Sequence, residues 1–188
     1  MEKWMKNYLN DLVKTLDTLP LDKLNDIINI LVRANKEKKQ VFVFGNGGSA
    51  ATSSHFVTDL GKGASRKLVS RFKCISLNEN VAWITALAND YSYEEVFLDQ
   101  LKNYALPGDV VITMSVSGNS PNLMKAFEWA KKNGLQTIAM IGGKKGDLIK
   151  IADCALVIES EHYGIVEDIH MIVSHLISYT FMEHPMIV

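Results

Sequence analysis

The spacing of hydrophobic residues changes from a helical to a strand-like pattern after residue 37. Over residues 1–37, apolar side chains recur at helical spacing in two segments that Leu19-Pro20-Leu21-Asp22 separates, so we expect two helices there. Short apolar runs rich in β-branched residues then follow at 40–45, 73–78, 109–114, 136–141 and 154–159. Helical patterns lie between and after them, at 48–61, 80–103 (in two pieces), 121–133, 146–152 and 164–182.

The five apolar runs lack polar alternation, which is typical of strands buried on both faces of a parallel sheet. Strand–helix alternation with short loops predicts an α/β protein of three layers, with helices on both faces of the sheet. No linker or repeat divides the sequence, so we expect a single domain over 1–188, made of N-terminal helices at 1–37 and an α/β core with a terminal helix at 38–188. Folds of this class bind ligands beyond the carboxyl ends of their strands.

Composition narrows the functional classes. The 188 residues carry a formal net charge of −1, so we expect neither nucleic acid nor an anionic membrane surface as a partner. No apolar run approaches the roughly 20 residues of a membrane span. Cys74 and Cys154 both lie in apolar runs, as buried thiols do. Together these features predict a cytoplasmic protein.

The first expected strand leads into a glycine-rich turn, Gly45-Asn46-Gly47-Gly48-Ser49, and then into a helix of small residues. Glycines let the backbone approach a ligand closely, and a helix N-terminus offers free N–H groups to an anion. The spacing is not the GxGxxG of dinucleotide-binding proteins, and the P-loop lysine is missing, so NAD and ATP are both disfavoured as ligands.

The third expected strand leads into a second loop, Ser115-Val116-Ser117-Gly118-Asn119-Ser120-Pro121-Asn122. Pro121 suits the first turn of a helix and Ser120 suits the N-cap. One serine would be explained by capping, whereas three serines beside a glycine indicate hydroxyls that surround the oxygens of a phosphate monoester. The loop has no lysine or arginine, so backbone N–H groups and hydroxyls must bind the anion.

The two loops and the segment 86-ALANDYSYEEVF-97 between them resemble the sugar isomerase (SIS) domain, and within it the phosphoheptose isomerases, which act on sedoheptulose 7-phosphate. The resemblance extends over almost the whole chain. It implies a five-stranded parallel sheet and a homotetramer in which the N-terminal helices join a bundle and the active sites lie between subunits. It also implies substrate contacts from Asn46, Gly47, Gly48, Ser49, Asp90, Ser115, Ser117 and Ser120.

Four further residues are placed for acid–base or metal chemistry. His55 and Asp59 are four residues apart on the helix after the first loop, so they share one face. Glu167 and His175 are eight apart on the terminal helix, about 80° apart around its axis, so a shared site is possible. Interconverting an aldose and a ketose requires a base near one carbon and an acid or a cation at the carbonyl oxygen.

The resemblance implies a glutamate base on the first of these helices and a histidine acid on the last, and some family members bind zinc. His55 and His175 match the family's histidines, but Asp59 stands at the glutamate position and Glu167 at a glutamine position. Three interpretations follow. Asp59 remains the base; or Glu167 is the base and Asp59 a metal ligand; or all four residues hold a divalent cation, expected to be zinc.

The leading hypothesis is therefore an aldose–ketose isomerase that makes D-glycero-D-manno-heptose 7-phosphate for lipopolysaccharide, capsule or S-layer glycans. The family's arginine after the helix-borne glutamate has no clear counterpart, so an isomerase of another sugar phosphate is an alternative. A second alternative is a SIS-fold binding protein without catalysis, like the protein that associates with the replication initiator DnaA. The retained histidines and carboxylates favour catalysis.

Overall fold

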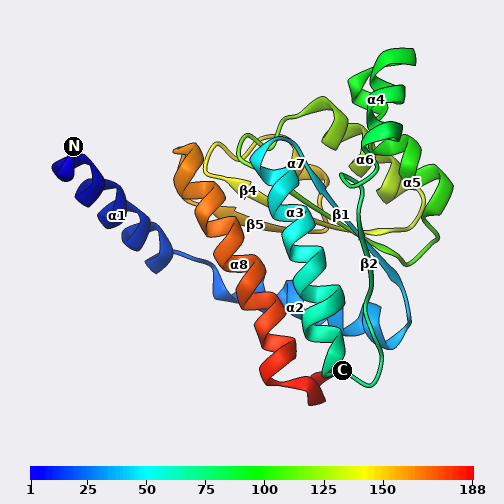
Figure 1. Cartoon of the computed structure of the whole chain (residues 1–188), viewed down its shortest axis with the longest axis horizontal. Helices are drawn as coiled ribbons and strands as arrows, with labels where there is room; N and C mark the ends of the chain where they lie inside the picture. Colours follow the sequence, from blue (N-terminus) through cyan, green and yellow to red (C-terminus); the bar gives the residue numbers. More distant parts are fainter.

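The computed structural model describes all 188 residues and confirms the predicted α/β class, with helices on both faces of one parallel sheet (Figure 1). The strand order is β2-β1-β3-β4-β5. The strands are β1 (Gln40–Gly45), β2 (Lys73–Ser76), β3 (Val110–Ser115), β4 (Gln136–Gly142) and β5 (Cys154–Ile158). Because β1 and β3 are hydrogen-bonded neighbours, the two predicted loops that follow them meet at the same edge of the sheet.

Two apolar layers attach the helices to the sheet. Within β1, Val41 and Val43 belong to one buried cluster, whereas Phe42 and Phe44 belong to the other, as the alternation of side chains along a strand requires. The first cluster lies under α2 (Leu21–Lys36), α3 (Gly48–Thr58) and α8 (Tyr163–Glu183). The second lies under α4 (Val81–Asp90), α5 (Leu98–Tyr104), α6 (Pro121–Lys132) and α7 (Leu148–Ile151).

Among the element boundaries that differ from the predictions, two lie close to the residues of the predicted site. The strand expected over 73–78 ends at Ser76, because the side chain of Asn78 binds the backbone N–H and carbonyl of Gly45 in place of strand pairing. The helix expected over 48–61 ends at Thr58 and continues as a π-helix, Asp59–Gly63, and a 3-10 turn, Ala64–Arg66. Wider turns of this kind are frequent at functional sites, and this one begins at Asp59.

The first helix, α1 (Glu2–Asp17), extends away from the rest of the molecule and has no buried residue (Figure 1). Tyr8, Leu12 and Leu16 pack against the first buried cluster, and at the start of α8 the Tyr8 hydroxyl donates to Asp168 Oδ2 at 2.6 Å. Gly164 leaves room for this hydroxyl, since a Cβ there would lie 2.8 Å from it. The hydrogen bond to Asp168 raises the pKa of Tyr8 to about 12, so Tyr8 remains a donor at neutral pH.

The terminal helix α8 is 21 residues long and packs its apolar side onto the sheet. Neither α8 nor any other helix combines the length and the apolar content that crossing a bilayer requires. His170 lies on the packed side and is fully buried. Burial lowers the pKa of His170 to about 4, an effect that the backbone of Met140 only partly offsets.

We predict that His170 makes the fold sensitive to acid. Between pH 6.5 and 4 the unfolded chain binds a proton at this residue that the folded chain does not. The free energy of unfolding therefore falls as the pH falls, by up to about 1.4 kcal/mol per pH unit. Urea denaturation at pH 7.5 and pH 5 should show a smaller loss of stability in His170→Leu than in the wild type. The exposed control His184→Leu should behave like the wild type; an equal loss in all three proteins would contradict the prediction.

Candidate active site

The two loops enclose a cavity of about 280 Å³ at the carboxyl ends of β1 and β3. Its position is the one at which parallel α/β sheets bind their ligands. Eight predicted residues line it: Asn46, Gly47, Gly48, Ser49, Ser115, Ser117, Ser120 and Glu167. The other lining residues, not predicted from the sequence, are Met114, Val116, Leu123 and Tyr163. Tyr163 is the first residue of α8, the helix that follows β5. Its position shortly after the last strand, at the edge of the sheet where ligands bind, is the signal from which it could have been predicted.

The glycine-rich loop needs two of its glycines for different reasons. Gly47 has φ +56° and ψ −124°, a conformation that residues with a side chain rarely adopt, and it caps the N-terminus of α3. Gly48 leaves room for Glu167, because a Cβ at this position would lie 2.6 Å from Glu167 Oε1 and the Glu167 side chain would have to shift. The carboxylate of Glu167 therefore lies directly against the first turn of α3, whose free N–H groups favour a negative charge. Glu167 is the only acidic residue that lines the cavity.

The serine loop presents hydroxyls whose hydrogens remain available to a ligand. Ser115 Oγ accepts from the backbone N–H of Gly118 at 3.0 Å, and Ser117 Oγ accepts from that of Asn119 at 3.3 Å. A hydroxyl that accepts such a bond can still donate its own hydrogen. Ser120 occupies the N-cap of α6 as predicted, but its side chain makes no capping bond. These hydroxyls are thus free to donate to phosphate oxygens.

A second group of side chains, His55, Asp59 and His175, meets on the outer side of α3 and α8. The two histidine Nε2 atoms lie 3.0 Å apart, and Asp59 Oδ2 lies 3.2 Å from His55 Nε2 and 3.6 Å from His175 Nε2. Three ligands bound tetrahedrally to zinc at ordinary N and O distances would lie about 3.3 Å from one another. The group therefore forms a possible metal-binding triad.

The cavity and the triad lie at two levels along one pair of helices. Helices α3 and α8 run side by side in the same direction, with Gly48 against Glu167 at the first level and His55 against His175 at the second (Figure 1). Seven or eight residues separate the levels, which corresponds to about 11 Å along a helix axis. Glu167 is accordingly not a member of the triad, and the interpretation with all four residues around one cation stays a prediction.

Asp90 is placed differently from the rest of the predicted set. It is exposed at the end of α4, accepts a hydrogen bond from Asn89 Nδ2 at 2.9 Å, and does not line the cavity. The segment after it is bound to α6, because Lys125 forms ion pairs of 2.9 Å with Glu94 and 2.8 Å with Glu95. A ligand in the cavity would have to extend out of it to reach Asp90.

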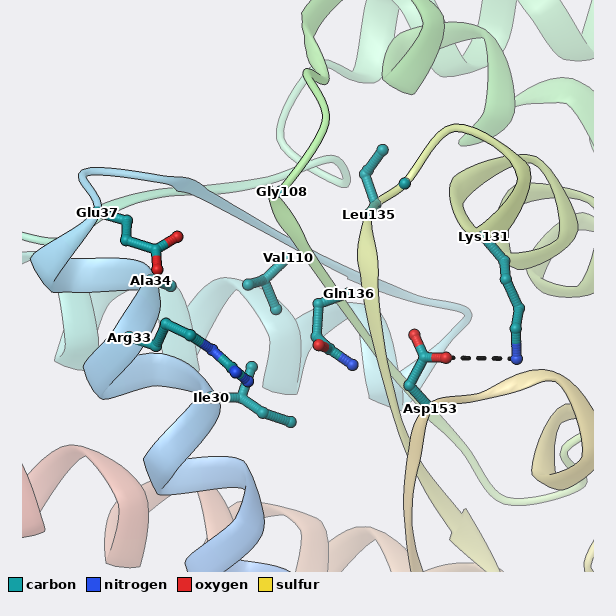
Figure 2. Close-up of a pocket in the computed structure, with 11 residues that line it drawn as sticks. Ile30, Arg33, Ala34, Glu37, Gly108, Val110, Lys131, Leu135, Gln136 and Asp153 are labelled. Carbon is teal, nitrogen blue, oxygen red and sulfur yellow. Dashed lines mark ion pairs between the residues drawn. The ribbon is translucent and has the colours of Figure 1, made fainter.

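A larger cavity, of about 480 Å³, lies at the opposite, amino-terminal edge of the sheet (Figure 2). Its charged residues balance one another, with Arg33 and Lys131 against Glu37 and Asp153, and Lys131 pairs with Asp153 at 3.3 Å. It has neither a phosphate-type loop nor a histidine, and one wall is the end of α2. The smaller cavity at the carboxyl edge is therefore the candidate active site.

The sheet and its two loops place the chain among SIS domain proteins, and residues 4–142 match the family model of the SIS domain. The probable phosphoheptose isomerase of Thermoplasma volcanium is 40% identical over 165 residues, which cover 87% of this chain and 82% of the relative. The phosphoheptose isomerase of Helicobacter pylori is 32% identical over 173 residues, 92% of this chain and 89% of the relative. This chain therefore belongs to the phosphoheptose isomerase family.

The fold agrees with solved structures of that family. The phosphoheptose isomerase of Neisseria gonorrhoeae superposes with a TM-score of 0.89 at 20% identity, covering 97% of this chain and 98% of the other. That of Francisella tularensis gives 0.85 at 23% identity, covering 97% and 96%. At these identities the likeness shows a shared fold, from α1 to the end of α8.

We predict that the triad is required for stoichiometric binding of a divalent metal. His55→Ala and His175→Ala each remove one of three ligands and should lose bound metal, because two ligands hold a cation far more weakly. The measurement is elemental analysis of protein purified without chelator or nickel resin and then dialysed against zinc. His184→Ala, an exposed histidine at the end of α8, is the matched control. Wild-type protein that retains no metal would contradict the prediction.

Proposed function

We propose that this protein is an aldose–ketose isomerase that converts sedoheptulose 7-phosphate into D-glycero-D-manno-heptose 7-phosphate. The observation that carries the proposal is a cavity lined by three serines of a phosphate-type loop and by one carboxylate, that of Glu167. Relatives named phosphoheptose isomerase, at 32% to 40% identity over most of their length, support the choice of substrate.

In this proposal the serine loop binds the phosphate. Ser115, Ser117 and Ser120 donate their hydroxyl hydrogens, and the positive end of α6 adds to the attraction. The sugar then extends toward the glycine-rich loop, where the backbone of Gly47 and Gly48 permits close approach. Fixing the phosphate in this way orients the sugar before any proton moves.

Glu167 is the proposed base that moves a proton between the two carbons at the carbonyl end. It is the acidic residue in the cavity, and Gly48 leaves the space that the carboxylate occupies. This corresponds to the interpretation in which Asp59 is a metal ligand rather than the base. The resemblance to the family implies a glutamate at the position of Asp59 and a glutamine at the position of Glu167, so in this chain both positions hold a carboxylate.

The donor set of His55, Asp59 and His175 fits zinc, and we propose zinc as the ion that these residues hold. Such an ion, when bound, supplies a positive charge that can polarise a carbonyl oxygen. Asp59 then acts as the third ligand, since its Oδ2 faces the Nε2 atoms of both histidines.

The protein is further proposed to be a homotetramer whose active sites lie between subunits. Trp4, Leu9 and Val13 of α1 are each at least 58% exposed, although an isolated helix of this length is only marginally stable in water. Leu176 and Tyr179 extend the apolar surface beside His175, where they are 42% and 53% exposed. A second copy of the chain would bury both surfaces and enclose the triad.

Because phosphorylated sugars are cytoplasmic metabolites, we place the enzyme in the cytoplasm, where its product would enter the synthesis of surface glycans.

The competing function is a SIS-fold binding protein without catalysis. Incubation with a panel of ketose phosphates, with and without zinc and with NMR detection of aldoses, separates the two. Turnover of another sugar phosphate alone would replace the substrate but keep the reaction, whereas thermal stabilisation by sugar phosphates without any turnover would favour the binding protein.

Two substitutions that restore the wider family's residues test the assignment of the base. Glu167→Gln should lower kcat at least 100-fold, because general-base catalysis contributes roughly that much or more, and metal content should be unchanged. The double variant Asp59→Glu with Glu167→Gln recreates the family pattern and should regain activity. A fully active single variant Glu167→Gln would instead identify Asp59 as the base.

Assembly through α1 gives a separate prediction. Leu9→Glu with Val13→Glu places two charges on the exposed apolar side of the helix and should reduce the tetramer to smaller species in light scattering coupled to gel filtration. Lys14→Ala, on an exposed position of the same helix, is the control and should remain tetrameric. A wild-type monomer at micromolar concentration would refute the proposed assembly.

A further inference from the structure

A reciprocal pair of side-chain amides joins the glycine-rich loop to the serine loop. Asn46 Nδ2 donates to Asn122 Oδ1 at 3.0 Å, and Asn122 Nδ2 donates to Asn46 Oδ1 at 2.9 Å. Asn122 lies in the first turn of α6 and is only 2% exposed. Asn46 lines the cavity, whereas Asn122 lies behind it. The position of one loop therefore depends on the other through this pair.

The orientation of both amides is fixed by a backbone group. The N–H of Leu123 is shared between the Ser120 carbonyl and Asn122 Oδ1, each at 3.0 Å, and a backbone N–H can only donate. The atom that it meets must be the oxygen of Asn122, so the Asn46 atom facing that oxygen must be nitrogen. This removes the usual ambiguity between the oxygen and nitrogen of a side-chain amide.

A tyrosine completes the arrangement from a third segment. The Tyr93 hydroxyl donates to Asn46 Oδ1 at 3.0 Å, so this oxygen accepts two hydrogen bonds and both of its lone pairs are used. One of the two hydrogens on Asn46 Nδ2 is used by Asn122. The other hydrogen is the single unused hydrogen-bonding group of the Asn46 side chain.

We propose that Asn122 and Tyr93 are positioning residues that hold the Asn46 amide with one N–H free for the ligand. Asn46 can then offer the cavity a donor and no acceptor, so it recognises an oxygen that carries lone pairs, such as a hydroxyl, carbonyl or phosphate oxygen of the sugar phosphate. The inference rests on the proposed function for the identity of that ligand. The ion pairs from Lys125 to Glu94 and Glu95 fix the tyrosine segment on α6, so Tyr93 reaches Asn46 from a held position.

The test is a double-mutant cycle on the full chain. Tyr93→Phe removes one hydroxyl and should raise KM for sedoheptulose 7-phosphate by about 2- to 12-fold, the range expected for one neutral hydrogen bond, with a smaller change in kcat. In an Asn46→Ala background the same substitution should change KM no further, because Tyr93 acts through Asn46. Tyr104→Phe is the matched control, since Tyr93 and Tyr104 are each 52% exposed, and it should behave like the wild type. Additive effects of Tyr93→Phe and Asn46→Ala would overturn the proposal.

A second measurement needs no substrate, so it separates this inference from the proposed function. In protein labelled with ¹⁵N-asparagine, the two hydrogens of Asn46 Nδ2 should exchange with water at different rates, with the one bound to Asn122 protected. Asn122→Ala should remove the protection, provided that its melting temperature shows a folded protein; Tyr93→Phe should shift the same resonances. Equal exchange of both hydrogens in the wild type would overturn the inference, whatever the enzyme assay shows.

Discussion

The contact between α3 and α8 is the constraint on which the site depends. The two helices lie in the same direction on one face of the sheet, so one pair of elements provides both the carboxylate beside Gly48 and the pair of histidines further along. The contact is close where α3 begins, because Gly48 has no side chain and the carboxylate of Glu167 lies against it. A change in the separation of these helices would alter the cavity and the triad together.

The fold could be predicted from the sequence almost completely, because its determinants are local. Uninterrupted apolar runs identified all five strands, and turns rich in glycine and serine marked the edge at which ligands bind. The boundaries that differed depend on distant partners. Nothing near Asn78 in the sequence indicates that its side chain binds the backbone of Gly45, and nothing near Asp59 indicates a π-helix.

The candidate site was predictable in its residue types but not in their grouping. Spacing along each helix placed His55 with Asp59 and left Glu167 with His175 as a possible pair. Whether Glu167 shares a site with the others depends on how two helices are aligned, which a single sequence does not encode locally. The amide pair of Asn46 and Asn122 was invisible for the same reason, since 76 residues separate its members. The resemblance to a family indicated the roles of the site residues, whereas the tertiary structure showed which of these residues lie next to one another.

The first two turns of α8 contribute both to the cavity and to the attachment of α1. Tyr163 and Glu167 form a wall of the cavity, while Gly164 and Asp168, on the adjoining side, receive Tyr8 of the projecting helix α1. A substitution in these two turns can therefore impair both ligand binding and the attachment of α1. We expect these residues to vary little among related sequences, and we expect substitutions that do occur there to accompany substitutions near Tyr8.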